Sequence, residues 1–173
     1  HPVDAQLVQG ILHVLELDRA HARLQPLADA AERARAEVAD FWSAPWPRTV
    51  VVVLPSTPEL LDPLVETRQG SEQVAVTLWR AAKHGTVIRV MFNPEVYDQM
   101  PALAREIVAR HEIAHVAQDA LPRGDVPVWL VEGIAEYVGY RGTGFSDAWV
   151  GRELLADVRA SGPPLSWPTD AAF

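Results

Sequence analysis

The chain carries His111-Glu112-Ile113-Ala114-His115 (HEIAH) at its most informative point. On a helix, residues four apart lie one turn apart on the same face, so both imidazole rings can point at one ion. Glu112 lies within the same arc, where its carboxylate can face a water on that ion without being a ligand. Neutral imidazoles suit zinc, which lowers the pKa of its water toward ~7 so that a neighbouring carboxylate can take the proton. The stretch therefore predicts a zinc site with hydrolytic chemistry.

The residues around this stretch favour a helix. Apolar residues recur at helical spacing, and Pro122 with Gly124 ends the pattern after Leu121. The pattern predicts helices over 101–120, 127–139 and 147–160. The first two would then be neighbours joined by a short turn, which is a helical hairpin.

A catalytic zinc ion needs a third protein ligand. The chain has no cysteine, and no histidine follows His115, so the candidates further along the chain are acidic. Asp119 lies one turn further along the same helix, which places its side chain beyond the ion. Asp125 lies in the connecting turn and suits the N-cap of the next helix. Glu132 and Glu136 are four apart on the next predicted helix, so both can face back across the hairpin. One would bind the metal and the other would orient a histidine, and spacing alone does not rank them.

The HEIAH stretch and the segment Trp129-Leu130-Val131-Glu132-Gly133-Ile134-Ala135-Glu136-Tyr137, preceded by Pro127, resemble the gluzincin metallopeptidases, and most closely the bacterial peptidase MA-like group. The resemblance implies that His111, His115 and Glu132 bind zinc and that Glu112 is the general base. It places Glu136 where thermolysin-like enzymes have an acid that does not bind the metal but orients one of the residues that do. It also implies hydrolysis of a peptide or protein substrate. Members are frequently exported or membrane-tethered, so we expect an exported or tethered bacterial protein whose flanking segments were removed.

Two features depart from better-known gluzincins. The connection between His115 and Glu132 is short, and thermolysin-like enzymes use a downstream histidine to hold the oxyanion, which this chain lacks. Tyr140 is the candidate that we assign to this catalytic role, because it lies at a helix end where a side chain can reach a cleft. The other candidates are Tyr97, Tyr137, Arg141, or a residue beyond Phe173.

The missing oxyanion histidine supports a second interpretation, in which a zinc-stabilised binding or scaffold domain has lost its peptidase activity. The retained Glu112 counts against it, because a purely structural zinc site has no use for a base. A third interpretation is a helical interaction module that binds no metal.

Short β-branched segments precede the helices, which is the α+β pattern. We expect one domain over 1–173, in which a long N-terminal helix over 4–42, kinked at Pro26, backs a small mixed sheet. The expected strands are 48–54, 74–79 and 86–92, and the expected short helix is 57–67. Residues 74–77 are the expected open edge, because zinc peptidases of this shape pair extended substrate with an edge strand.

The charge and the apolar pattern of the chain argue against two classes of partner, nucleic acid and the membrane interior. The chain has 15 basic and 23 acidic residues, a net charge of -8, which argues against nucleic acid as a partner. No apolar run approaches the ~20 residues that a membrane-spanning helix needs, so we expect no transmembrane segment.

Overall fold

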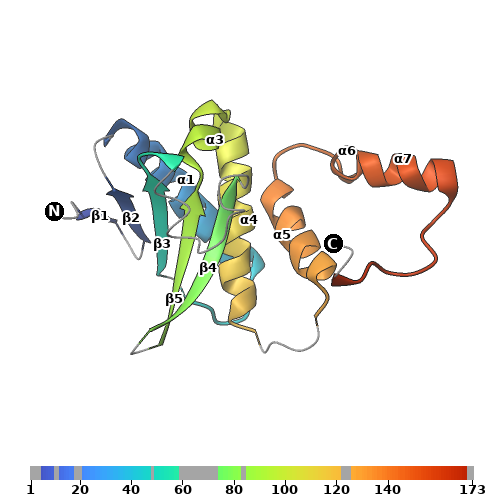
Figure 1. Cartoon of the computed structure of the whole chain (residues 1–173), viewed down its shortest axis with the longest axis horizontal. Coiled ribbons are helices and arrows are strands. Elements are labelled where there is room, and N and C mark those ends of the chain that lie inside the picture. The colour runs from blue at the N-terminus through green and yellow to red at the C-terminus, as the bar shows by residue number, and fades with distance from the viewer. Residues whose placement is uncertain are drawn as a thin grey trace.

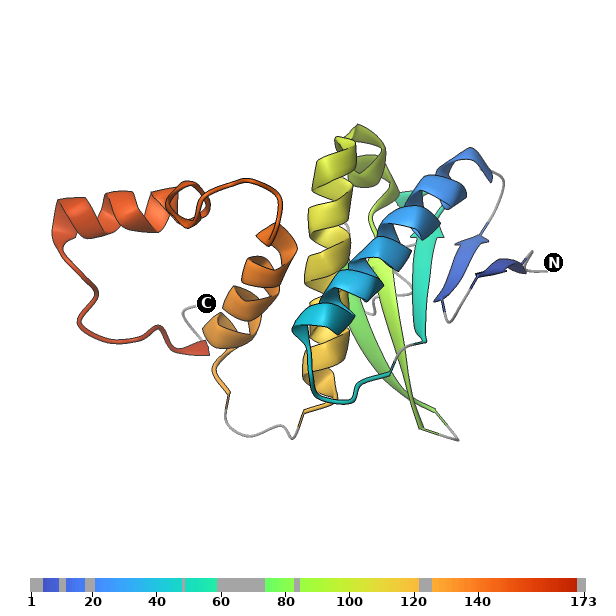
Figure 2. The same cartoon turned by 180° about the vertical axis from the view of Figure 1, so that it is seen from behind.

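The computed structural model of the chain describes residues 5–9, 12–17, 21–47, 49–58, 74–82, 85–121 and 126–170. One mixed sheet carries helices α1 and α4 on one face, as the two opposite views agree (Figures 1 and 2). Helix α5 lies beside α4, and α6 and α7 extend away from the sheet (Figure 1). The predicted α+β class is confirmed.

The sheet has five strands in the order β1-β2-β3-β5-β4. Strands β2 and β5 run parallel to the central β3, while β1 and β4 pair antiparallel with β2 and β5 at the two edges. The strands are β1 (Ala5–Gln9), β2 (Leu12–Leu17), β3 (Val50–Pro55), β4 (Ala75–Ala82) and β5 (Gly85–Phe92). The three strands predicted from the sequence are present, and β4, which contains most of the expected open edge, lies at one side of the sheet.

The prediction of one helix over 4–42 is wrong in its first half. Residues Ala5–Gln9 and Leu12–Leu17 form the hairpin β1–β2, and helix α1 begins at His21. The apolar spacing there fitted a helix, but an extended segment can pair with the β-branched run of β3, and this long-range pairing decides the outcome. Pro26 lies inside α1 without ending it, although its ring removes one N–H from the backbone hydrogen bonds of the helix.

Helix α4 is the central element of the helical layer, because it packs against α1, α5 and β4. It follows α3, whose start is fixed by Asn93: its side chain accepts a hydrogen bond from the backbone N–H of Glu95 at 3.1 Å. The helices are α1 (His21–Phe41), α3 (Pro94–Gln99), α4 (Ala102–Asp119), α5 (Val128–Tyr140), α6 (Asp147–Val150) and α7 (Arg152–Ser161). The three helices predicted after residue 100 are therefore present, the last divided at Gly151. Most of the helix predicted over 57–67 lies outside the described residues.

The valine run of β3 is buried on both faces, as the sequence predicted. Val50 and Val52 belong to the main core with α1 and α4, while Val53 packs with Met91 in a second cluster. Residues alternate between the two faces of a strand, so the main core lies on the helical face of the sheet. This core anchors α4 through Ile113, which is 1% exposed.

The tail that follows α7 returns to the start of α5 (Figure 1). Asp170 Oδ1 accepts a hydrogen bond from the backbone N–H of Val128 at 2.8 Å, and Trp167 stacks on Trp129 with ring centroids 4.7 Å apart. Pro127, at the N-cap position of α5, makes no side-chain cap of its own. The tail thus supplies the cap that the helix lacks. None of the helices in the described ranges combines the length and apolar character that a bilayer crossing requires.

Replacing Ile113 by alanine should lower the free energy of unfolding by about 2–5 kcal/mol, because it leaves a cavity between α4 and the sheet. Leu103→Ala on the same helix is the matched control, since Leu103 is 40% exposed, and should cost no more than about 0.5 kcal/mol. Urea unfolding of the metal-free proteins measures both. Equal losses would show that Ile113 does not anchor the helix.

Candidate metal centre

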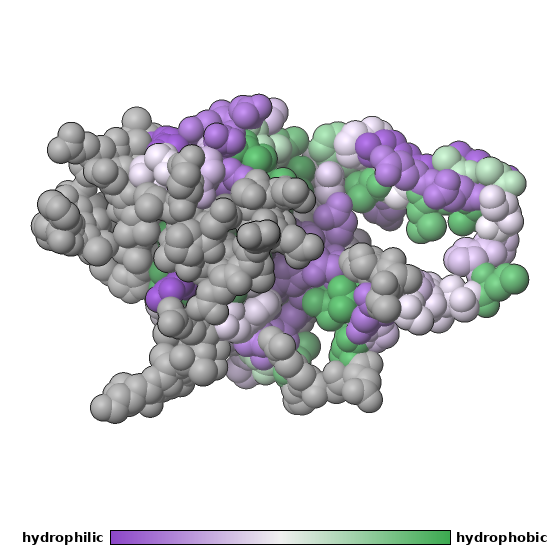
Figure 3. Space-filling model, viewed as in Figure 1, coloured by the Kyte–Doolittle hydropathy of each residue, from purple (hydrophilic) through white to green (hydrophobic). Residues whose placement is uncertain are grey.

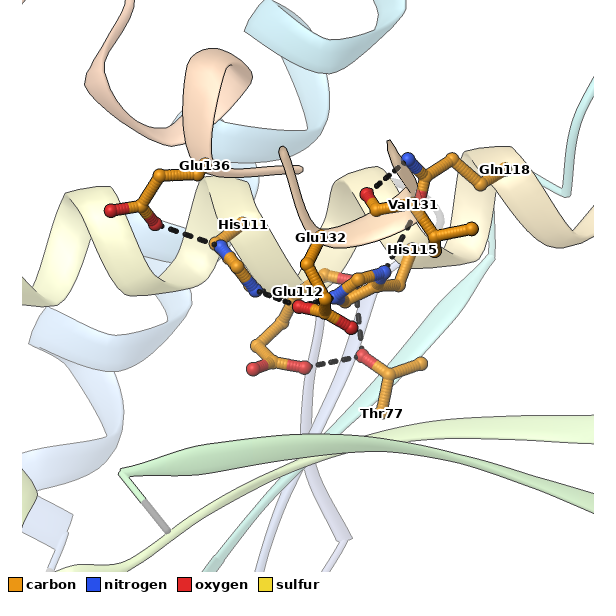
Figure 4. A network of polar contacts seen from close by, with 8 residues as sticks. All are labelled: Thr77, His111, Glu112, His115, Gln118, Val131, Glu132 and Glu136. Atoms are coloured by element: carbon orange, nitrogen blue, oxygen red, sulfur yellow. Dashed lines mark hydrogen bonds and ion pairs between the residues drawn. The ribbon is translucent and has the colours of Figure 1, made fainter. Parts of the chain in front are cut away.

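Three side chains from α4 and α5 converge on one point (Figure 4). His111 Nε2 and His115 Nε2 are 3.1 Å apart, and Glu132 Oε2 lies 3.3 Å from each of them. Among the described residues, these three form the one group of three histidine or acidic side chains whose ligand atoms all lie within 4.8 Å of one another. Of the two glutamates that spacing left unranked, Glu132 is the one that joins the histidines.

The size of this triangle suits a tetrahedral zinc ion. Zinc binds nitrogen and oxygen ligands at about 2.0–2.1 Å, which sets neighbouring ligand atoms of a tetrahedron about 3.3 Å apart. The three observed separations, 3.1, 3.3 and 3.3 Å, are close to this value. The residues could therefore hold zinc and leave the fourth position open.

Close packing of the two helices brings Glu132 to the histidines. Gly139 on α5 allows this approach, because a Cβ there would lie 3.1 Å from the Ile107 carbonyl oxygen and 3.6 Å from His111 Cβ. Ala135, one turn earlier, is fully buried. Small residues one helical turn apart thus let α5 lie near α4 beside the first histidine.

The orientation of His115 is set by a hydrogen-bond chain that the sequence did not reveal. Gln118 Nε2 donates to the Val131 carbonyl at 2.8 Å, which leaves its Oε1 to accept from His115 Nδ1 at 2.9 Å. The Nδ1 of His115 must then carry the proton, and its Nε2 keeps a free lone pair toward the triad. The signal was present, because a residue three positions after a histidine is its neighbour on a helix.

Glu136 holds the other ring in a similar way. Its Oε2 lies 3.3 Å from His111 Nδ1, on the side of the ring away from Glu132 (Figure 4). A carboxylate there favours the tautomer that leaves Nε2 free for a metal. When the rings are neutral, both therefore offer Nε2 as the nitrogen that a metal would bind.

The carboxylates shift the pKa values within the triad. Burial, the largest single influence on His111, opposes its charged form, but hydrogen bonds to Glu132 and Glu136 and nearby negative charge outweigh it and raise the pKa from 6.5 to about 9. The facing imidazoles of His111 and His115 lower the pKa of Glu132 far below its usual value, against the effect of burial. Without a metal, the ring of His111 is therefore protonated on both nitrogens and positively charged at neutral pH.

Glu112 lies beside the triad and does not belong to it. Its side chain is buried, and Thr77 Oγ1 on β4 lies 2.6 Å from its Oε2. Burial raises the pKa of Glu112, opposed by the Thr77 hydrogen bond and by the charges of His111 and His115. A carboxylate with a raised pKa close to a metal position has the properties of a general base.

The triad opens into a cavity of about 830 Å³ between β4, α4 and α5. Among the described residues, the lining includes Glu112 and Asp119, and neither lysine nor arginine occurs in it. The space-filling view shows hydrophobic surface next to hydrophilic surface between the sheet and α5 (Figure 3). Large apolar residues of the lining that are exposed are Val74, Trp79, Leu121, Val126 and Val128. An exposed apolar cavity with a few convergent polar groups is typical of a ligand site.

The candidates for oxyanion stabilisation lie elsewhere. Tyr140 packs against Phe145 and Trp149 and is not among the described residues that line the cavity. Tyr97 is fully buried in the core. Tyr137 and Arg141 both contact Phe41, on helix α1. The structure does not bring Tyr140 to the triad, and its catalytic role stays a prediction without support from this geometry.

Of the acids considered and set aside as ligands, Asp119 lines the cavity outside the triad, and Asp125 lies outside the described residues. Comparisons with protein-family models, with curated proteins and with solved structures found no match. Functional inference for this chain therefore starts from the residues and their geometry.

Glu132→Gln should weaken zinc binding by more than about 100-fold, because it replaces the charged atom that faces both imidazoles. Glu136→Gln should cost about 10–100-fold, since it removes only the support behind one ring. Titration of the metal-free proteins with zinc against a competing chelator measures both. An equal loss, or a larger loss for Glu136, would contradict the assignment of the ligand.

Zinc affinity should rise with pH up to about 9. Below that pH the metal must displace the proton of His111, whose pKa is raised to about 9, so affinity should change by up to about tenfold per pH unit. Calorimetry at pH 7 in buffers of different ionisation enthalpy should show that about one proton is released per zinc. No proton release would contradict this view of the metal-free triad.

Proposed function

We propose that this protein is a zinc-dependent peptidase of the gluzincin type, with His111, His115 and Glu132 as the metal ligands and Glu112 as the general base. The observation that carries the proposal is the triangle of three ligand atoms with sides near 3.3 Å, with a buried carboxylate beside it. A structural zinc site closes all four positions with protein ligands, whereas three ligands and a neighbouring acid suit catalysis.

A zinc ion held there would polarise the scissile carbonyl and make a water nucleophilic at neutral pH. Glu112 takes the proton of the attacking water and then delivers it to the leaving amine, so the carboxyl returns to its starting state within each turnover. Glu136 and Gln118 keep the two imidazoles oriented throughout. The ordered positions of these side chains reduce the reorganisation that the reaction would otherwise require.

The cavity supports a peptide as the substrate. Strand β4 lies at the edge of the sheet and lines the cavity, so an extended peptide can pair with its backbone. The exposed apolar residues Trp79, Leu121 and Val128 offer contacts for substrate side chains. Backbone pairing and side-chain contact would together place a peptide bond near the open metal position.

A second candidate is a zinc-binding scaffold domain that has lost catalysis. The observation in its favour is that no tyrosine, arginine or lysine occurs among the described residues that line the cavity. The buried Glu112 favours the enzyme. Burying a carboxylate costs free energy, and a scaffold would gain no function that offsets this cost. Turnover distinguishes the two functions directly.

Wild-type protein should bind one zinc per chain and cleave a mixed library of fluorogenic peptides. Glu112→Gln should keep the metal and lose at least about 100-fold in kcat, because general base catalysis contributes about 10²–10⁴-fold. His115→Ala should lose both metal and activity. Metal analysis and peptide cleavage on the same samples measure these outcomes.

Glu153→Gln on α7 is a matched control, because Glu153 is exposed and does not line the cavity. It should change neither zinc content nor kcat. Zinc binding without cleavage of any peptide would support the scaffold instead, and failure to bind zinc would refute both candidates.

A further inference from the structure

Thr77 makes two contacts with the same glutamate. Its Oγ1 lies 2.6 Å from Glu112 Oε2 and 3.0 Å from the Glu112 carbonyl oxygen. The side chain is 5% exposed, on the edge strand β4 directly across from α4 (Figure 4). From the sequence, Thr77 is predicted only to lie in the open edge of the sheet, and no role is predicted for its hydroxyl group.

One hydroxyl group cannot donate to both of these oxygens at once, because it has a single proton. When the Glu112 carboxylate is ionised, the hydroxyl donates to Oε2. With the proton directed to the closer oxygen, Oε2, the hydroxyl group fixes the position of the Glu112 carboxylate relative to β4.

We propose that Thr77 is a positioning residue, whose hydroxyl group ties the general base to the edge strand and holds its carboxylate in place. The inference rests on the proposed peptidase function, and it goes beyond it by assigning a role to the strand. Because β4 would pair with the peptide, the hydroxyl bond links the base to the element that carries the substrate. The distance between base and scissile bond is then set by one short contact.

The side chains around Thr77 agree with a specific role for the hydroxyl group. Its neighbours that line the cavity, on β4 and directly before it, are apolar: Val74, Ala75, Val76 and Trp79. Of the described lining residues from this strand, Thr77 is thus the one with a hydroxyl, and it contacts the base. A buried hydroxyl or carboxyl group without a hydrogen-bond partner is destabilising, so this pairing also stabilises the buried Glu112 side chain.

Two substitutions separate the hydroxyl group from the shape of the side chain. Thr77→Val keeps the branched shape and removes the hydrogen bonds, whereas Thr77→Ser keeps the hydroxyl and removes a methyl group. For the valine variant we expect kcat to fall by about 10–100-fold, because a misplaced catalytic group is costly, while KM and zinc affinity stay within about twofold. The serine variant should recover most of kcat.

A readout that needs no turnover uses the metal-free protein. If the two side chains support each other, Thr77→Val and Glu112→Gln should shift the urea midpoint less in combination than the sum of their separate shifts. In the zinc form, adding Thr77→Val to Glu112→Gln should change kcat by less than about twofold, since the positioning residue acts only through the base. Should the valine variant fail to fold, Thr77→Ala replaces it in every arm.

The outcomes separate this inference from the function on which it rests. If the wild type cleaves peptides and Thr77→Val keeps its kcat, or if serine and valine lose activity equally, the role of Thr77 is refuted. Loss of zinc affinity in the valine variant would also overturn it, because the effect would then lie in the metal site. If the wild type cleaves no peptide, the proposed function itself fails, and strictly additive midpoint shifts would refute the pairing as well.

Discussion

The packing of α4 against α5 is the constraint on which the rest of the structure depends. Both histidines lie on one helix and the third ligand lies on the other, so the distance between the helix axes decides whether a triad exists. Gly139 permits the approach at one end, and the bond from Gln118 to the Val131 carbonyl joins the helices at the other. The sheet holds α4 from below through a buried apolar core. A change at either helix contact would therefore move Glu132 away from the two histidines.

The surroundings of the triad combine groups that are costly to bury separately. Glu112 and His115 are both almost completely buried, and two further carboxylates lie within hydrogen-bonding reach of the imidazoles. Each polar group has a partner in the same cluster, which offsets its loss of water. Pairing of this kind also explains the opposite pKa shifts of His111 and Glu132, since each stabilises the charged form of the other.

Local patterns in the sequence predicted what depends on a single helix or strand. The HEIAH helix, the helix with Glu132 and the three strands from β3 to β5 follow from apolar spacing and from punctuation by proline and asparagine. Which of Glu132 and Glu136 joins the histidines depends on how α5 is rotated about its own axis relative to α4. The spacing of residues within α5 does not determine this rotation. The β1–β2 hairpin was missed because its apolar residues fit either period and its partner β3 lies far along the chain. Thr77 was missed because its role depends on a contact between β4 and α4, and Gln118 because its orientation is fixed by a bond to the next helix.

The tail after α7 has a consequence for the triad although it lies far from it in the sequence. Asp170 and Trp167 secure the first turn of α5, and Glu132 follows one turn later. Fraying of a helix begins at an uncapped end and spreads inward. The mobility of the Glu132 carboxylate therefore depends on the C-terminal tail, although the tail contributes no ligand. A chain shortened to end at Ser161 would keep every ligand and yet present the third one from a loosened helix. The geometry of the site is in this sense a property of the C-terminal segment as much as of the residues that form it.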